Sequence, residues 1–158
     1  MADSITSKVV GAEVLSRRLK ALVGIPRMLM IPIVAKYALQ LQTLARQLVS
    51  VDLGDTRRSI LTQFLGQGLT ASIGSNAKTA VWLEKGTRPH FPPPSALAPW
   101  CARHGMKPGA EWAVARKIAQ VGTKATPFLE PAFLQVAPYF VGEANAQLGA
   151  GIEDVTRS

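Results

Sequence analysis

The feature that most constrains the fold is an apolar stripe that begins just after Pro32. Its members recur every three or four residues with polar side chains between them, which is the spacing of one face of an α-helix. Proline suits the first turn of a helix, where its missing N–H has no intrahelical partner. The pattern predicts a helix from Pro32 to about Val49 that buries one face. The stripe consists of Ile33, Tyr37, Leu41, Leu44 and Leu48.

A shorter stripe of leucines precedes this one. It predicts an amphipathic helix from about Val9 to Val23. Gly24 and Pro26 are expected to end that helix, because both residues disfavour a helix interior. The leucines are Leu15, Leu19 and Leu22.

A β-hairpin is predicted in the middle of the chain. Ser59–Leu65 and Leu69–Ile73 have strand-like composition and are separated by the loop Gly66-Gln67-Gly68. Apolar and polar residues alternate in the second run, so one face of the sheet should be buried and the other solvated. Just before the hairpin, Asp55 is expected to cap a short helical turn over residues 56–58.

A helical insertion is predicted after the hairpin. Thr79–Glu84 fits either a third strand or a short helix, and its pattern does not decide. Four prolines within residues 88–94 predict an extended loop. Two short helices are expected next, over Ser95–His104 and from Pro108 to Gly122.

The last helix is expected to begin at Pro127 and to kink at Pro138, with a flexible tail over 149–158. The element order predicts an α+β fold in a single domain, residues 1–158. In it a small antiparallel sheet packs against a long N-terminal helix and a C-terminal helix, with a helical insertion at 88–124. The apolar stripe of the last helix is Leu129, Phe133, Val136, Phe140 and Ala144.

Charge is unevenly distributed along the chain. The net charge is +8, and residues 57–124 hold ten Lys or Arg against two acidic residues, whereas 125–158 hold one Arg against four acids. Such asymmetry can serve nucleic-acid phosphates or steer one subunit onto the next, and composition does not distinguish the two. Hydrophobic residues make up 47% and charged residues only 18%, which suggests that partner subunits cover part of the apolar surface.

The compartment can be inferred from what the sequence contains. A single Cys101 provides no intramolecular disulfide and fits a reducing cytosol. We find no segment with the ~18 apolar residues needed to span a bilayer, and the longest apolar run, Met28–Ala35, contains Pro32. The first residues do not resemble a secretory signal. We therefore expect assembly in the cytoplasm, without a membrane.

Catalytic chemistry has little support in the sequence. Cys101, His104 and His90 are the only Cys and His residues, and their spacing does not match a zinc site. We find no Gly-x-Ser-x-Gly elbow and no phosphate-binding glycine loop. We expect neither an enzyme nor a bound metal or cofactor.

Three motifs together carry a resemblance to a known family. Val51–Ile60 resembles the pattern "Val-Asp-Thr-Gly-x-Leu-Arg-x-Ser-Ile", and Thr79–Thr87, which overlaps the run Val81–Pro89, resembles "Tyr-Ala-x-x-Val-Glu-x-Gly-Thr". Pro127–Ala132 matches "Pro-Phe-Leu-x-Pro-Ala". In this order and spacing they resemble the head–tail connector or tail-completion proteins of tailed bacteriophages, the family related to the minor tail protein Z of phage lambda. The likeness covers most of residues 8–148, and it departs from the family at Thr79, where the usual residue is Tyr.

These motifs also have a physical interpretation as scaffold. Gly86 is expected to end its element with a positive φ, and Glu84 and Thr87 can satisfy backbone groups at that turn. Glu84, a lone carboxylate in a basic segment, can pair either locally or across a subunit contact. Phe128 and Leu129 are expected to seat the last helix on the sheet.

The resemblance implies a structural virion protein that forms a closed ring of six copies at the head–tail junction. Its partners are expected to be other copies of the chain, the connector or stopper, and the tail-terminator or tail-tube proteins. Cyclic rings use heterologous interfaces, so the basic 57–124 segment facing the acidic last helix of a neighbour is a candidate contact. The interface candidates are Arg57, Arg58, Glu84, Lys85, Arg88, Arg116, Lys117, Glu130 and Glu143.

Three alternatives remain open at this point. A tail-terminator ring belongs to the same class of protein. A DNA-contacting neck or packaging factor would use the basic residues of 57–124 on phosphates, and should bind duplex with a steep salt dependence. A small enzyme using His90, Cys101 and His104 would require stoichiometric zinc.

Overall fold

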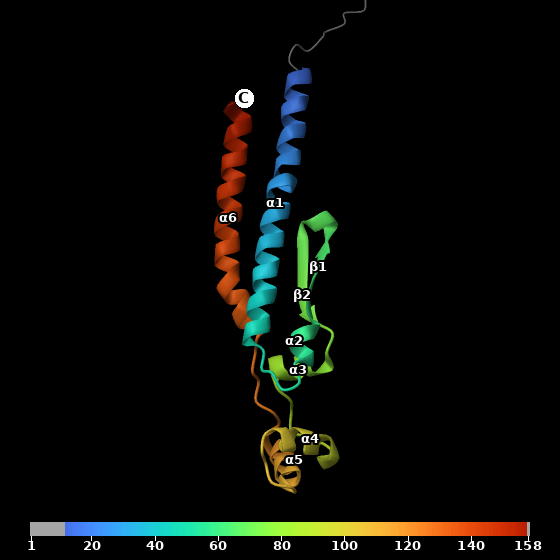
Figure 1. The fold of residues 1–158 in the computed structure, drawn as a ribbon. Coiled ribbons are helices and arrows are strands. Elements are labelled where there is room, and N and C mark those ends of the chain that lie inside the picture. The colour runs from blue at the N-terminus through green and yellow to red at the C-terminus, as the bar shows by residue number, and fades with distance from the viewer. Residues whose placement is uncertain (1–11, 158) are drawn as a thin grey trace, which may run out of the picture.

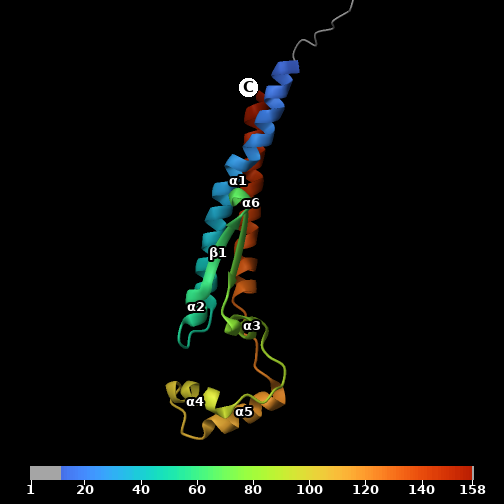
Figure 2. The same cartoon turned by 90° about the vertical axis from the view of Figure 1, so that its right-hand side faces the viewer.

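The computed structural model describes residues 12–157, with side chains from residue 27 onward except at positions 155 and 156. The elements are α1 Ala12–Leu48, α2 Asp55–Ser59, β1 Ile60–Leu65, β2 Thr70–Ser75, α3 Lys78–Lys85, α4 Pro94–Arg103, α5 Ala110–Val121 and α6 Leu129–Arg157. Two long antiparallel helices, α1 and α6, run along the molecule, and a β-hairpin lies beside α1 (Figure 1). A lobe formed by α4 and α5 lies at the other end from Ala12 and Arg157 (Figures 1 and 2).

The predicted α+β class is confirmed. A two-stranded antiparallel sheet contacts α1, and α1 packs along α6. Most of the predicted stripe of α1 is buried or half-buried, although Leu48 is exposed. The stripe of α6 was predicted less well, because Phe133 is 56% exposed. α1 is thus the central layer, with the hairpin and α6 both packed against it.

The prediction of two separate N-terminal helices is wrong. α1 is one helix that continues through Gly24, Pro26 and Pro32. A proline inside a helix removes one hydrogen bond and costs about 3 kcal/mol, but it does not forbid the helix. Tertiary packing can override such local preferences. The first residues of the predicted helix, 9–11, lie outside the described part of the chain.

The expectation that no segment could span a membrane also needs correction. Residues Arg27–Leu48 of α1 are long and apolar enough to do so by length and composition. Core helices of soluble proteins meet the same criterion. Here the segment packs on α6 and on the hairpin, and its Arg46 donates two hydrogen bonds to the carbonyl of Ile60 at the start of β1. One side of this segment is thus packed against the rest of the chain, and 28% of it is buried.

The hairpin agrees with its prediction to within two residues. β1 and β2 pair from Ile60 opposite Ser75 to Leu65 opposite Thr70. All three loop residues, 66–68, have positive φ, which two glycines adopt without strain. Ala71 and Ile73 are half-buried while Thr70 and Ser72 are exposed, as expected, but Leu69, also expected on the buried face, is 36% exposed.

The predicted cap on α2 is not formed. The N-cap residue is Gly54, with φ 81°, and it receives no side-chain hydrogen bond. The Asp55 carboxylate instead accepts a hydrogen bond from Arg58 on the same helix. Thr56 is the buried residue of α2, and its hydroxyl lies 2.7 Å from that of Thr79. A side-chain hydrogen bond thus connects α2 to α3, although it does not cap α2.

The remaining elements follow the sequence with one further difference, in the C-terminal tail. Thr79–Glu84, left open between strand and helix, lies within helix α3. Residues 88–93 have no regular structure before α4, as the prolines predict. α6 begins at Leu129 and continues to Arg157, so the described part of the expected tail is helical.

Candidate assembly surface

Two of the motifs recognised in the sequence meet at the start of α6. The Glu84 carboxylate accepts hydrogen bonds from the backbone N–H groups of Phe128, Leu129 and Glu130, at 2.8, 3.0 and 2.9 Å. A helix leaves its first four N–H groups without an intrahelical acceptor, and a negative charge at that end is favourable. A carboxylate from α3 therefore caps α6 from 44 residues or more away in sequence.

The hydrogen bonds also affect the acidity of Glu84. Partial burial raises the pKa of its carboxyl, but the three backbone hydrogen bonds together outweigh burial, so the pKa lies below its ordinary value. Glu84 is therefore ionised at neutral pH. Sequence analysis left its pairing open between a local and an intersubunit partner, and the structure uses it locally.

A matched pair of Gly-Thr dipeptides lies beside this cap. The N–H of Thr87 donates to the carbonyl of Thr123 at 3.1 Å, and the N–H of Thr123 donates to the hydroxyl of Thr87 at 3.0 Å. The two threonine hydroxyls lie 2.9 Å apart. Gly86 and Gly122 precede them, end α3 and α5, and have φ of 70° and 72°.

Neither glycine can accept a side chain without rearrangement. A Cβ on Gly86 would lie 2.4 Å from the carbonyl oxygen of Thr123, and one on Gly122 would lie 2.0 Å from that of Thr87. The two chain segments that lead into and out of the lobe thus touch backbone to backbone. We call residues 83–88 together with 122–130 the joint.

The joint is seated on the hydrophobic core. Phe128 is fully buried, in one cluster with Ile60 of β1, with Ala45 of α1 and with Val49 just after the end of α1. Leu129 packs against the same cluster. Phe128 thus contacts the sheet at Ile60, as predicted, but α6 itself packs along α1 rather than on the sheet. The joint therefore sets the positions of α6, α1 and the hairpin relative to the lobe.

We call α1, α6 and the hairpin the body. An ion pair that the sequence did not suggest also connects the lobe to the segment between α1 and α2. Nε of Arg103 on α4 donates to the Asp52 carboxylate at 2.9 Å. This hydrogen bond lowers the pKa of Asp52. Because the two residues are 51 positions apart, no local pattern could have indicated the pair.

The interface candidates from the sequence do not form one patch of free side chains. Arg58 bonds to Asp55, and Glu84 caps α6. Glu143 lies between the chain's own helices, where the hydroxyl of Tyr37 donates to it at 2.7 Å and Lys36 forms an ion pair with it. The hydrogen bonds from Lys36 and Tyr37 lower the pKa of Glu143. The candidates that are exposed and form no ion pair within the described residues are Arg57, Lys85, Arg88, Arg116, Lys117 and Glu130.

The residues considered for metal binding are used in other ways. Cys101 is buried on α4, and the ring of His104 stacks on Trp100 with 4.2 Å between centroids. Nδ1 of His90 lies 2.8 Å from the carbonyl oxygen of Arg88. Among the residues that the structure describes, no group of three or more His, Cys, Asp or Glu is placed to hold a metal ion.

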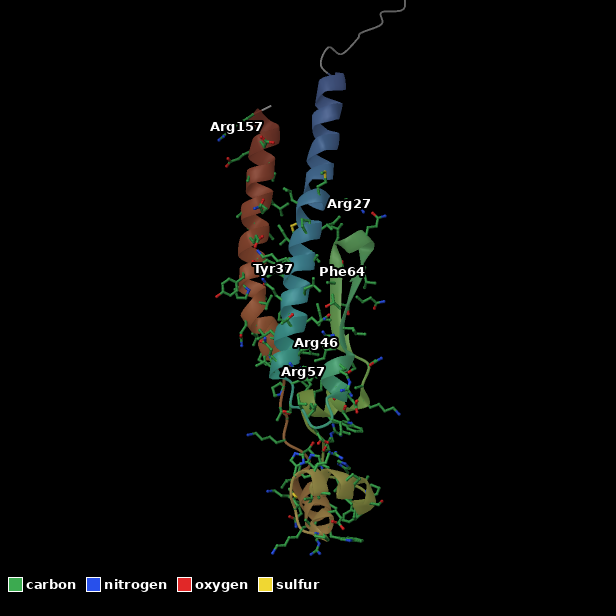
Figure 3. All side chains as sticks on the ribbon, in the orientation of Figure 1. Arg27, Tyr37, Arg46, Arg57, Phe64 and Arg157 are labelled. Atoms are coloured by element: carbon green, nitrogen blue, oxygen red, sulfur yellow. The ribbon has the colours of Figure 1, made fainter. Side chains whose placement is uncertain are left out.

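A different surface is apolar and open. An apolar groove of about 390 Å³ lies between α1, β2 and α6. Tyr37, Leu41, Ile73 and Phe140 are among its lining residues, and the rings of Tyr37 and Phe140 meet edge to face. Phe133 of α6 also lines it and is more than half exposed. Figure 3 shows the side chains of this part of the molecule, with Tyr37 and Phe64 labelled on either side of α1.

The chain as a whole exposes more surface than a compact monomer. Its solvent-accessible surface is 11,549 Å², whereas a compact protein of 16.9 kDa has about 7,700 Å².

Comparison with known protein families, with curated proteins and with solved structures finds no match for this chain. The resemblance described above therefore rests on its motifs and on the part they play in the fold.

Proposed function

We propose that this chain is a structural subunit of a tailed-bacteriophage virion. In this proposal several copies form a ring at the head–tail junction, where it completes the neck and joins the connector to the tail tube. The protein is assembled in the host cytoplasm, acts by its shape rather than by catalysis, and requires neither cofactor nor membrane. Six copies are expected from the family resemblance.

The observation that carries the proposal is the contact between the family motifs. Glu84 and Gly86-Thr87 belong to one motif, and Phe128 and Leu129 belong to another. The capping of α6 by Glu84 makes the two motifs parts of one joint. Motifs that matched by chance would have no reason to meet. Their contact supports the view that the resemblance concerns a shared structural unit.

The excess surface supports the oligomeric part of the proposal. Large apolar side chains are exposed on every layer of the body, including Leu39 of α1, Leu61 of β1, and Leu134 and Tyr139 of α6. Exposed apolar surface of this extent is typical of chains that are covered by partners.

The proposed role can be tested genetically. An amber codon in place of Trp82, in the genome of the phage that encodes the chain, removes the protein in a host without suppressor. We expect electron micrographs to show DNA-filled heads and finished tails that remain separate. Addition of the purified protein to that extract should restore joined, infectious particles. Normal virions, or a lysate without filled heads, would contradict the proposed role.

The same micrographs test the tail-terminator alternative. A protein that ends tube growth would, when absent, leave tails of irregular length. Separate tails of uniform length instead agree with a role in completion or joining.

The alternative of DNA contact has one observation in its favour. Of the ten basic residues of 57–124, two are paired with aspartates, and the other eight are exposed and form no ion pair within the described part of the chain. Titration of the isolated protein with a fluorescent duplex at several salt concentrations tests this alternative. Binding that weakens steeply with salt would support it, and no binding at low salt would remove it. The eight are Arg57, Lys78, Lys85, Arg88, Lys107, Arg116, Lys117 and Lys124.

A further inference from the structure

The hairpin lacks the features that normally prevent strands from pairing with other molecules. Proteins protect edge strands with charged residues, prolines or bulges. No residue from Ser59 to Ala77 is charged, although the whole chain has 28 charged residues, and none in that range is a proline. Leu61, Phe64 and Leu65 of β1 are 57%, 44% and 47% exposed.

Both outer edges of the sheet are available. Within the described part of the chain the sheet has two strands, and no further strand pairs with β1 or with β2. Arg46 occupies the carbonyl of Ile60, at the start of β1. A two-stranded sheet is marginally stable by itself and gains from additional strands. An uncharged hairpin with two open edges is therefore suited to pairing with another strand.

The apolar groove lies beside β2, where it can receive side chains of an added strand. It borders β2 on the side of the helices, and its lining includes Ala71 and Ile73 of β2 together with Phe133 and Phe140 of α6. A strand added beside β2 would pass over this groove. The side chains that it directs toward the helices would then enter it. α6 has no charged residue from Pro131 to Gly142, so this side of the contact is also uncharged.

β1 carries an aromatic side chain, Phe64, that suits this groove. Residues 60, 62 and 64 of β1 share one face, because side chains alternate along a strand. Ile60 on that face is fully buried, whereas Phe64, opposite Ala71, is 44% exposed. Phe64 and the groove beside β2 are complementary in chemistry. They share one face of the sheet, because Phe64 is paired with Ala71 of the groove lining, but the outer edges of β1 and β2 lie on opposite sides of the hairpin.

We propose that β1 of one subunit pairs with the outer edge of β2 in the next subunit, and that Phe64 of the first inserts into the groove between β2 and α6 of the second. This contact uses two different surfaces, so it is heterologous and continues from copy to copy until a ring closes. The depletion of charge on both surfaces is what the core of an interface shows. The inference rests on the proposed ring, but not on the position of that ring in a virion.

Disulfide trapping of the full-length chain tests the contact. In a Cys101→Ala background, Phe64→Cys is combined with Phe133→Cys, and each change is also made alone. The matched control combines Phe91→Cys with Phe133→Cys, because Phe91 is an equally exposed phenylalanine that lies on the lobe side of the joint. Native mass spectrometry of the unmodified chain gives the number of copies, and mild oxidation followed by a non-reducing gel gives the covalent products.

We expect the Phe64–Phe133 pair to produce a ladder of covalent multimers that ends at the native copy number. The single variants and the Phe91 control should remain monomers. A covalent dimer from Phe64→Cys alone would overturn the inference, because two β1 strands would then face each other. The inference would also be overturned if the Phe64–Phe133 pair formed an internal disulfide alone, or if it gave no ladder although the unmodified chain forms a ring. An unmodified chain that stays monomeric would overturn it as well. The amber test examines the virion role independently of these outcomes.

Discussion

The joint and the hairpin differ in how far a single subunit completes them. In the joint, three N–H groups at the start of α6 bond to Glu84, and Thr87 and Thr123 bond to each other. Phe128 beside them is fully buried. In the hairpin, both outer edges lack a pairing strand within the described chain, and Leu61 and Phe64 remain exposed.

This difference predicts that substitutions in the two regions affect different quantities. Substitutions in the joint should change the free energy of unfolding and leave the affinity between folded subunits unchanged. Substitutions on the outside of the hairpin should do the reverse. Three predictions test the separation, beginning with the largest expected effect.

Phe64→Glu should abolish assembly while the subunit remains folded. A charge placed in an apolar interface must be desolvated, and aromatic residues at the centre of an interface often contribute more than 2 kcal/mol. We expect the dissociation constant between subunits to rise at least about 100-fold, as measured by sedimentation velocity. Phe91→Glu, the matched change on an exposed loop, should leave the sedimentation unchanged. Equal effects of the two variants would place the interface elsewhere.

Gly122→Ala should destabilise the subunit strongly. The new Cβ meets the carbonyl oxygen of Thr87, and alanine must adopt a positive φ. We expect a loss of about 3 kcal/mol or more in the free energy of unfolding, measured with urea. Gly105→Ala is the control, because Gly105 has φ of 68° but no atom within 4 Å of its Cβ position, so only the backbone cost of about 1 kcal/mol applies. Similar losses for both would show that the close approach at Gly122 is unimportant.

Glu84→Gln should have a smaller effect on the same quantity. The amide retains one acceptor oxygen for the three N–H groups but loses the negative charge at the start of α6. We expect a loss of about 1–2 kcal/mol at pH 7, because charge-assisted hydrogen bonds contribute more than neutral ones. Glu130→Gln, an exposed change at the same helix end, should cost less than about 0.5 kcal/mol.

The pH dependence of the stability difference between wild type and Glu84→Gln gives an independent check. The pKa of Glu84 is lower in the folded chain than its ordinary value of 4.5. Its stabilising contribution is therefore complete above about pH 4.5 and is lost as the pH falls through the folded pKa. The difference between wild type and Glu84→Gln should shrink over that acidic range and stay constant from pH 6 to 8. A constant difference at all pH values would mean that the charge of Glu84 does not matter.

Local sequence patterns predicted most of the helices and strands but few of the contacts between them. The apolar spacing of α1 and α6 and the glycines at residues 66–68 are short-range signals, and they predicted the hairpin and the presence of both helices, but not that α1 is one helix or that α6 continues to Arg157. Glu84, by contrast, acts on N–H groups more than 40 residues away. The sequence does not indicate whether its carboxylate bonds within the subunit or to a neighbouring subunit.

The errors have the same origin. Pro26 and Pro32 disfavour a helix locally, yet α1 continues through both. Phe133 fits the spacing of a buried stripe, but the groove beside it is not filled by the chain itself. Glu143 was chosen for its charge, and Lys36 and Tyr37 of the same subunit bind it. Charge reversal at Glu143 would therefore disturb the subunit before it tested any ring.

The bridge between Thr87 and Thr123 has a consequence for how such a chain can vary. Everything between these residues leaves the body and returns to it at one place. Segments whose ends are held together can be shortened, lengthened or replaced with little effect on the path of the surrounding chain. The lobe of α4 and α5 also meets the rest of the chain at the Arg103–Asp52 pair and at the cleft that Trp100 and His104 line with residues 50–56. We therefore expect changes in the length of the loop between α4 and α5 to be tolerated better than changes at these contacts.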